Sequence, residues 1–224
     1  MNFIGQKGQD FWVLSEILNY KKNGYFVDLA ATDGVKINNT LIMEKELDWN
    51  GICIEPNPKY IKQLKENRKC FVSNAVVDSV NDKTVKFRID NGELGGIVDN
   101  DTDNNYQLRG SQLKNATIIV LKTKTLESIL DEFNSPKVID YLSLDVEGCE
   151  ERILYTFPFH KYTFLTMTIE RPTQKLEKKL FENGYVFVMK SKKLPFDVFY
   201  VHNSIPNFEN IEKETYSPTP KKDW

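Results

Sequence analysis

The 224-residue sequence contains only three cysteines, and their positions exclude several kinds of small domain. Cys53, Cys70 and Cys149 are widely spaced, so no pair has zinc-finger spacing, and nothing resembles a disulfide framework. The N-terminal segment MNFIGQKGQD also lacks the apolar stretch of a signal peptide. Together these absences predict a protein of the reducing cytoplasm.

The sequence also lacks a basic excess and long apolar runs. Thirty basic and 32 acidic residues give a formal net charge of −2, which argues against nucleic acid as the main partner. Apolar runs such as residues 118–121 are far shorter than the ~20 residues that span a bilayer. Hydrophobic residues make up 40% of the chain, which is enough to bury a core.

Short β-rich apolar runs alternate with helix-patterned segments, which predicts an α/β sheet. We expect strands at 25–30, 51–55, 70–75, 85–90, 118–122, 139–144, 164–169, 185–189 and 198–201. Helices are expected at 8–21, from the turn after residue 34 to about 47, from 58 to 67, at 126–133, from about 149, and at 173–183. We expect one domain over 1–204, an insertion or lid at about 91–117, and a poorly packed tail at 205–224.

The first candidate site is the strand–turn–helix around Asp28, together with Glu55 at the end of the next strand. In α/β sheets such a turn cradles a nucleotide, and the acidic residue accepts hydrogen bonds from both ribose hydroxyls. The turn Ala30–Gly34 lacks the G-x-G-x-x-G pattern that a pyrophosphate requires, whereas a cofactor without phosphate does not need it. The alternative is a purely structural strand with a surface Glu55.

The second candidate site is Asp145-Val146-Glu147-Gly148, directly after the strand at 139–144. Glu170 ends the next strand, so these carboxylates are expected at the same sheet edge. There they could bind a divalent metal or supply a general base. Capping of the following helix by Asp145 or Glu147 is the structural alternative.

A third pattern, Asp99-x-Asp101-x-Asp103, resembles the start of a calcium loop. The required sixth-position glycine is Asn104 and the twelfth-position glutamate is Gly110, so the loop is incomplete. An Asp-x-Asp pair also serves as the metal clamp of nucleotide-sugar glycosyltransferases. The remaining interpretation is a solvated polar loop.

Five segments in consecutive order resemble the FkbM-type methyltransferase family: FVDLAATDGVKINNT, WNGICIEPNP, ENRKC, IDYLSLDVEGCEERIL and LTMTIE. The resemblance implies a class I methyltransferase (Rossmann-like) fold, with a seven-stranded, mostly parallel sheet, helices on both faces and a final antiparallel strand. It implies an insertion after the third strand. It further implies S-adenosylmethionine-dependent methyl transfer to a hydroxyl of a sugar, a glycan or another small molecule.

The resemblance also implies which residues bind S-adenosylmethionine. Asp28 and the turn from Ala30 to Gly34 would hold its methionine part, Glu55 its ribose, and Asn74 and Ala75 its adenine. The complete set is Gln9, Asp28, Ala30, Thr32, Asp33, Gly34, Asn39, Glu55, Pro56, Asn57, Asn74 and Ala75. The family usually has glycine where this chain has Ala30, and the added methyl group is expected to narrow the gap between the turn and the cofactor.

Two ways of activating the acceptor hydroxyl are open at this stage. Asp145 is the expected general base, with Glu147 as the other catalytic candidate. Alternatively, Mg²⁺ or Mn²⁺ held by Asp145, Glu147 and Glu170 would lower the pKa of the hydroxyl. Two other functions also stay open, a glycosyltransferase using Asp99–Asp103 and a binding module that has the fold without the activity.

Overall fold

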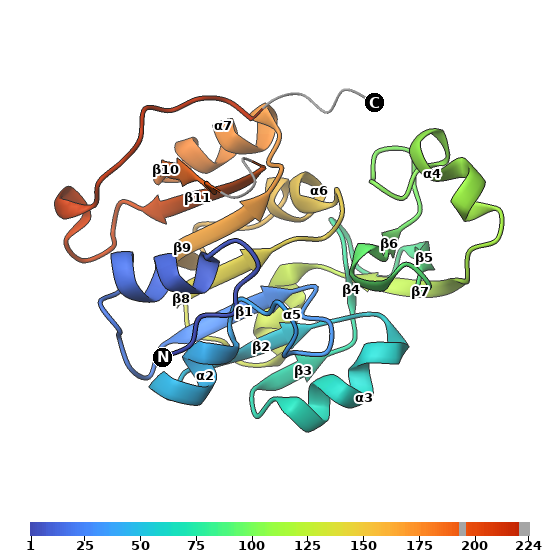
Figure 1. Ribbon diagram of the computed structural model, residues 1–224. Helices are drawn as coiled ribbons and strands as arrows, with labels where there is room; N and C mark the ends of the chain where they lie inside the picture. The colour runs from blue at the N-terminus through green and yellow to red at the C-terminus, as the bar shows by residue number, and fades with distance from the viewer. Residues whose placement is uncertain (193–195, 220–224) are drawn as a thin grey trace.

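The computed structural model describes residues 1–192 and 196–219, and a seven-stranded sheet forms its centre (Figure 1). Across the sheet the order is β10 (Tyr185–Lys190), β11 (Asp197–His202), β9 (Thr163–Glu170), β8 (Val138–Leu144), β1 (Tyr25–Leu29), β2 (Asn50–Ile54) and β3 (Phe71–Ser73). Strands β9, β8, β1, β2 and β3 pair in parallel, and β11 is antiparallel to both of its neighbours. The predicted α/β class with seven strands in one sheet is confirmed.

Helices cover both faces of this sheet. Side chains alternate between the faces along each strand, so each face presents apolar side chains that the helices bury. In β1, Val27 and Leu29 join a buried cluster with α5 (Leu126–Glu132), α6 (Glu150–Tyr155) and α7 (Gln174–Glu182). Phe26 joins a second cluster on the other face, with η1 (Trp12–Ile17), α2 (Leu41–Leu47) and α3 (Pro58–Asn67). Every helix within residues 1–192 and 196–219 is too short or too polar to cross a bilayer.

Two predicted helices are shorter than expected. The N-terminal one consists of α1 (Gln9–Phe11) and the π-helical η1, and it stops at Ile17 because Asn19 and Tyr20 adopt left-handed backbone angles. The helix expected directly after the turn begins only at Leu41, since four residues of the 30–40 segment have positive φ: Ala30, Thr32, Gly34 and Ile37. Positive φ is incompatible with a right-handed helix.

The insertion after the third strand is larger and more regular than predicted. β4 (Val76–Val77), β7 (Ile118–Lys124), β5 (Thr84–Arg88) and β6 (Gly96–Ile97) form a second sheet in that order. The 91–117 segment was expected to be an unpatterned lid, but it contains η2 (Gly92–Leu94), β6 and α4 (Tyr106–Leu113) (Figure 1). Val85 and Phe87 share the buried cluster of β1 and β2, so the small sheet packs on the large one.

The poorly packed tail expected at 205–224 stays a prediction: most residues of its described part, 205–219, are exposed, although several contacts tie it to the domain. Glu214 donates its backbone N–H to the carbonyl of Val188 in β10 (2.8 Å), and Tyr216 contacts the rings of Phe181 and Phe187. The Tyr216 hydroxyl donates to the buried carboxylate of Glu177 (3.0 Å). A short helix, η3 (Phe208–Asn210), lies in the same segment. Residues 220–224 lie outside the described residues.

Candidate active site

The carboxyl ends of β2, β1, β8 and β9 meet at one edge of the large sheet, because these strands are parallel. Two cavities open there, of about 560 and 960 Å³. Leu29, Ala30, Thr32 and Glu93 line both of them. The two cavities therefore adjoin each other at the end of β1, and together they are called the groove.

Glu55 lies in the first cavity, directly after β2, and is only 5% exposed. Its carboxylate accepts hydrogen bonds from two backbone N–H groups, those of Thr32 (3.0 Å) and Asn57 (2.7 Å). Burial raises the pKa of Glu55 to about 7, against the lowering effect of these two bonds. Each oxygen keeps a lone pair for a further donor. Pro56 and Asn57 line the cavity beside it, and Asn57 also caps α3 through the N–H of Lys59 (3.1 Å).

The rest of the first cavity is mainly apolar and is shared between the two sheets. Ala75 lines it, as predicted, together with Val76 and Val77 of β4, Phe87 of β5 and Ile97 of β6. Asn74 is exposed and does not line either cavity. Phe87 was not predicted to line a ligand cavity. Its place between Val85 and Ile89 in an alternating apolar pattern did indicate a side chain on the buried face of a strand.

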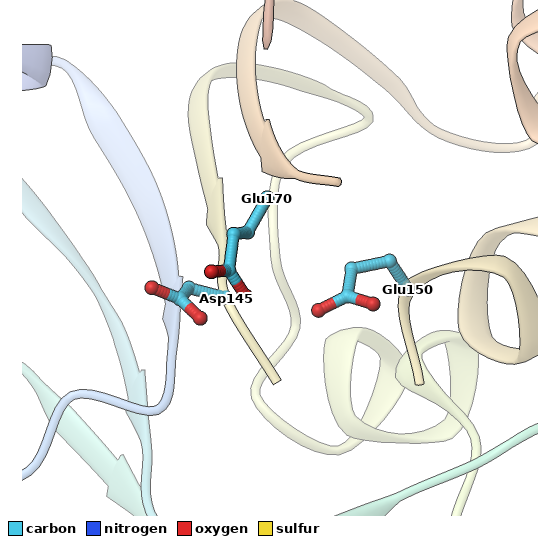
Figure 2. A group of neighbouring side chains, drawn as sticks. All are labelled: Asp145, Glu150 and Glu170. Carbon is cyan, nitrogen blue, oxygen red and sulfur yellow. The ribbon is translucent and has the colours of Figure 1, made fainter. Parts of the chain in front are cut away.

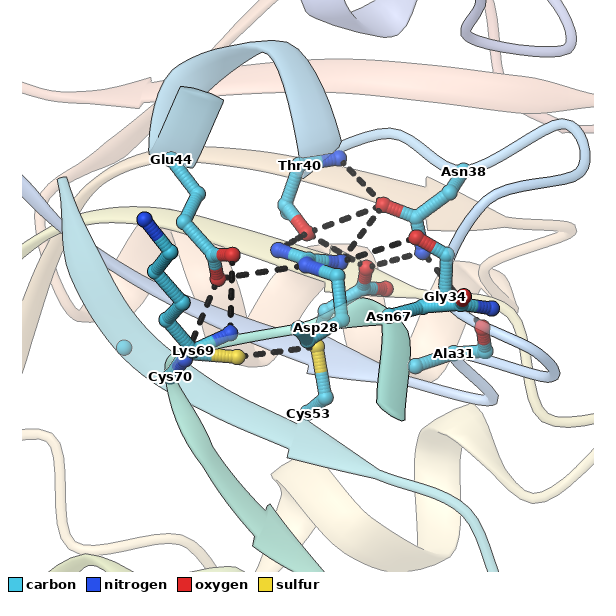
Figure 3. Close-up of polar contacts among 12 residues, drawn as sticks. Asp28, Ala31, Gly34, Asn38, Thr40, Glu44, Cys53, Asn67, Lys69 and Cys70 are labelled. Carbon is cyan, nitrogen blue, oxygen red and sulfur yellow. Dashed lines mark hydrogen bonds and ion pairs between the residues drawn. The ribbon is translucent and has the colours of Figure 1, made fainter. Parts of the chain in front are cut away.

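Asp28 belongs to a buried network that shapes the loop before α2 (Figure 3). Its Oδ2 accepts hydrogen bonds from Asn38 Nδ2 (2.9 Å) and Thr40 Oγ1 (2.8 Å). Arg68 donates to Asn38 and Thr40 and forms an ion pair with Glu44 (3.2 Å). Burial raises the pKa of Asp28, although the charge of Arg68 acts in the opposite direction. Asp28 and Asn38 line the second cavity, so the network fixes the wall of that cavity.

Asn39 also lines the second cavity and has free hydrogen-bonding capacity. Its Nδ2 donates to Ser143 Oγ (3.0 Å), which fixes the side chain from β8. Its Oδ1 is buried and accepts no hydrogen bond from the described residues. Since buried polar atoms are normally paired, this oxygen is suited to a donor on a ligand.

Three other predicted cofactor residues do not line either cavity. Gln9 accepts a hydrogen bond from the N–H of Lys7 (2.7 Å), and Asp33 accepts from Val35 and Lys36 (both 2.9 Å). Gly34 has φ +77°, and a side chain there would meet Leu64 at 2.6 Å. In this structure Asp33 and Gly34 shape the turn after β1, whereas Gln9 holds the segment before α1.

Three carboxylates gather where β8 and β9 end, those of Asp145, Glu150 and Glu170 (Figure 2). One oxygen from each lies within 4.8 Å of the others. Burial, followed by the charge of Glu170, raises the pKa of Asp145 well above its ordinary value. Glu150 is buried at the start of α6 and accepts backbone N–H bonds from Val146 (3.0 Å) and Gly148 (3.3 Å).

Glu147, expected as the third member of this group, is not part of it. Its Oε2 lies 3.7 Å from Arg171 and 3.8 Å from Arg109. Burial and the charge of Glu170 raise the pKa of Glu147 to about 7, and the two arginines oppose this rise. Arg171 also lies 2.6 Å from Glu170, so a protein cation already neutralises part of the acidic edge.

The Asp99-x-Asp101-x-Asp103 pattern does not form a metal clamp. Asp99 (2.7 Å) and Asp101 form ion pairs with Arg152, whereas Asp103 is buried and forms an ion pair with Arg171. Two different arginines therefore hold the three carboxylates. This arrangement contradicts the glycosyltransferase hypothesis that depends on them.

The family comparison agrees with the geometry of the groove. A family model described as "Methyltransferase FkbM domain" matches residues 28–187. The chain belongs to the FkbM methyltransferase family. Membership makes it an S-adenosylmethionine-dependent methyltransferase, and the match includes Asp28, Glu55 and Asp145.

No curated protein matches this FkbM methyltransferase. Three similar solved structures are a precorrin-6y C5,15-methyltransferase from Geobacter metallireducens GS-15, a METTL16 MTase domain, and a human methyltransferase 10 domain containing protein. Their identities are 14%, 12% and 11%, with TM-scores of 0.40, 0.48 and 0.44. Each alignment covers 86% of this chain, and 85%, 64% and 79% of the respective neighbour. At this level of similarity none of them carries an argument about function.

The resemblance implies a glycine where this chain has Ala30, and the φ of 66° at Ala30 is a backbone conformation that favours glycine. An L-residue in this left-handed region costs about 1–2 kcal/mol, which glycine avoids. We expect Ala30→Gly to raise the free energy of unfolding by about 0.5–1 kcal/mol, after the greater entropy of the unfolded glycine chain is subtracted. Urea unfolding followed by circular dichroism measures this change.

The matched control for Ala30→Gly is Ala31→Gly. Ala31 is the buried neighbour and has no positive φ, so glycine there removes a packed methyl group and adds only flexibility. We expect this variant to lose about 1 kcal/mol. Equal destabilisation by both substitutions would show that the backbone at Ala30 is not strained.

Proposed function

We propose that the protein transfers the methyl group of S-adenosylmethionine to a hydroxyl of a sugar, a glycan or a similar small molecule, on a class I methyltransferase fold. The observation that carries this proposal is the groove formed by the two adjoining cavities. Its apolar half lies beside Glu55, and its polar half lies beside Asp145. The sheet order, with β11 antiparallel beside β9, supports the class I assignment.

The residues of the groove fit the chemical groups of the cofactor. The apolar walls, including Val76 and Phe87, suit an adenine ring, and Glu55 offers lone pairs to two ribose hydroxyls. Asn39 Oδ1 offers an unpaired acceptor for the α-ammonium group. The carboxylates at the edge, among them Asp28 and Asp145, favour a positively charged ligand.

The proposed catalytic step depends on Asp145. Bound S-adenosylmethionine supplies an electrophilic methyl group, and the protein must supply a hydroxyl that is ready to attack. Asp145 lines the polar half of the groove, and burial and the charge of Glu170 raise its pKa, which makes it a stronger proton acceptor than an ordinary aspartate. It would take the hydroxyl proton while the groove holds the reacting groups in line.

Calorimetry with S-adenosylhomocysteine tests the cofactor part of this proposal. We expect binding heat with one site per chain. A screen of hydroxylated acceptors with methyl-labelled S-adenosylmethionine then tests the reaction, and label recovered in an ether linkage supports it. Cofactor binding without turnover on a broad glycan panel would favour the binding module instead. The absence of binding heat with S-adenosylhomocysteine would refute the proposal.

Divalent metal is not required in this proposal, and we expect activity to persist after treatment with EDTA. Asp145, Glu150 and Glu170 are the hard oxygen ligands that Mg²⁺ or Mn²⁺ prefers. However, Glu170 already pairs with Arg171, and Glu150 already accepts two backbone N–H bonds. Label transfer before and after dialysis against EDTA measures the effect. Loss of activity that Mn²⁺ or Mg²⁺ restores would show that an ion activates the hydroxyl.

A further inference from the structure

Three carboxylates stand in a row across the polar half of the groove. Asp197 begins β11 and pairs with Glu170 of β9, while Asp145 directly follows Leu144, which pairs with Ile169 of β9. The register therefore places Asp145, Glu170 and Asp197 at the same level on three adjacent strands. All three line the 960 Å³ cavity.

Asp197 has a carboxylate oxygen, Oδ2, that is buried without a hydrogen-bond donor among the described residues. The residue is only 7% exposed. Burial and the charge of Glu170 raise the pKa of Asp197 to about 6, whereas Lys7 and Arg171 lower it. Burying a carboxylate oxygen without a hydrogen-bond donor costs free energy of desolvation. A hydrogen-bond donor on a ligand would offset this cost at Asp197.

We propose that Asp197 binds the acceptor, by accepting a hydrogen bond from a second hydroxyl that is not itself methylated. This inference rests on the proposed function, in which Asp145 faces the reacting hydroxyl. Asp145 and Asp197 flank Glu170, so an acceptor with two hydroxyl groups would contact both ends of the row. A neutral polyol such as a hexopyranoside has this chemistry.

The charge of the cavity narrows the class of acceptor further. The described lining contains more carboxylates than cations, with Glu147 and Glu93 adding to the row, and Lys36 is paired with Glu93 (2.6 Å). An acceptor that carries phosphate or carboxylate would therefore meet a repulsive field. The acidic lining, to which Asp197 contributes, thus favours neutral hydroxylated acceptors over their phosphorylated or uronic forms.

The test compares Asp197→Asn with the wild-type protein on methyl hexopyranosides and their monodeoxy analogues, using methyl-labelled S-adenosylmethionine. We expect the variant to raise the acceptor KM about 10-fold to 100-fold, the effect of losing a hydrogen bond to a charged group. The affinity for S-adenosylhomocysteine should not change. Asp48→Asn, at an exposed position outside both cavities, is the matched control and should behave as wild type.

A deoxy acceptor separates binding by Asp197 from a merely structural role. Removing the second hydroxyl from the acceptor should raise the wild-type KM by the same factor, and Asp197→Asn should then add no further increase. If the variant does not fold, the deoxy series on the wild-type protein still gives the answer. A wild-type KM that no deoxygenation changes would overturn the inference.

The remaining outcomes distinguish this inference from the proposed function. If S-adenosylhomocysteine does not bind, the proposed function fails and the role of Asp197 fails with it. If S-adenosylhomocysteine binds but no hexopyranoside accepts label, the role of Asp197 is wrong while use of the cofactor stands. An unchanged acceptor KM in an active Asp197→Asn variant refutes only the role of Asp197.

Discussion

Asp145→Asn is expected to lower the rate of methyl transfer by about 10²–10⁴-fold, the usual contribution of a general base. The substitution keeps the shape of the side chain but removes its ability to take a proton. Because Asp145 acts on the acceptor in this proposal, and S-adenosylhomocysteine lacks the sulfonium charge, affinity for S-adenosylhomocysteine should be retained. Single-turnover label transfer and calorimetry measure the two quantities separately.

Glu147→Gln is the matched control, since it changes a carboxylate two residues away. Glu147 faces Arg109 and Arg171 at 3.8 and 3.7 Å, so its charge serves to hold these arginines. We expect a smaller loss of rate than for Asp145→Asn. Normal turnover in Asp145→Asn would eliminate Asp145 as the base, and an equal loss in both variants would assign the proton transfer to the acidic group as a whole.

The parts of the fold that could be predicted are those in which local pattern and burial agree. The strands around Leu142 and Met167 are rich in apolar residues, because the large sheet buries both of their faces. In contrast, β4 and β6 are two residues long, too short for any periodicity to identify them. Residues 35–40 were predicted to be helical but precede α2, because the positive φ of Ile37 leaves no signal in the residue types.

The residues of the candidate site also divide into those that the sequence could predict and those that it could not. Glu55 and Asp145 were predictable, since each directly follows an apolar strand whose carboxyl end lies at the edge that α/β proteins use for ligands. Glu150 and Asp197 were not, because the first is one of several charges at a helix start and the second begins a short strand between β10 and β9. Only the pairing of β11 with β9 brings Asp197 to the groove.

Glu55→Ala is expected to weaken binding of S-adenosylhomocysteine by about 1.5–3 kcal/mol, the value of hydrogen bonds to a charged group. This corresponds to about a 10-fold to 150-fold increase in Kd. The alanine also leaves the N–H groups of Thr32 and Asn57 without their acceptor, so Glu55→Gln provides the control in which one side-chain acceptor stays. Thermal unfolding of both variants shows whether the fold is retained. An unchanged Kd in a folded Glu55→Ala variant would refute the ribose assignment.

The pH dependence of binding gives a second and independent test of Glu55. Burial raises its pKa to about 7, so the free protein carries the ionised carboxylate mainly above this pH. Because ribose hydroxyls donate to the ionised form, affinity should fall as the pH falls, by about tenfold from pH ~8 to pH ~6. Adenosine is the appropriate probe, since it contains the ribose without the titrating amino-acid end of the cofactor. The Glu55→Gln variant should bind adenosine weakly and with no such dependence, and a wild-type affinity that does not change between these pH values would show that the carboxylate does not contact the sugar.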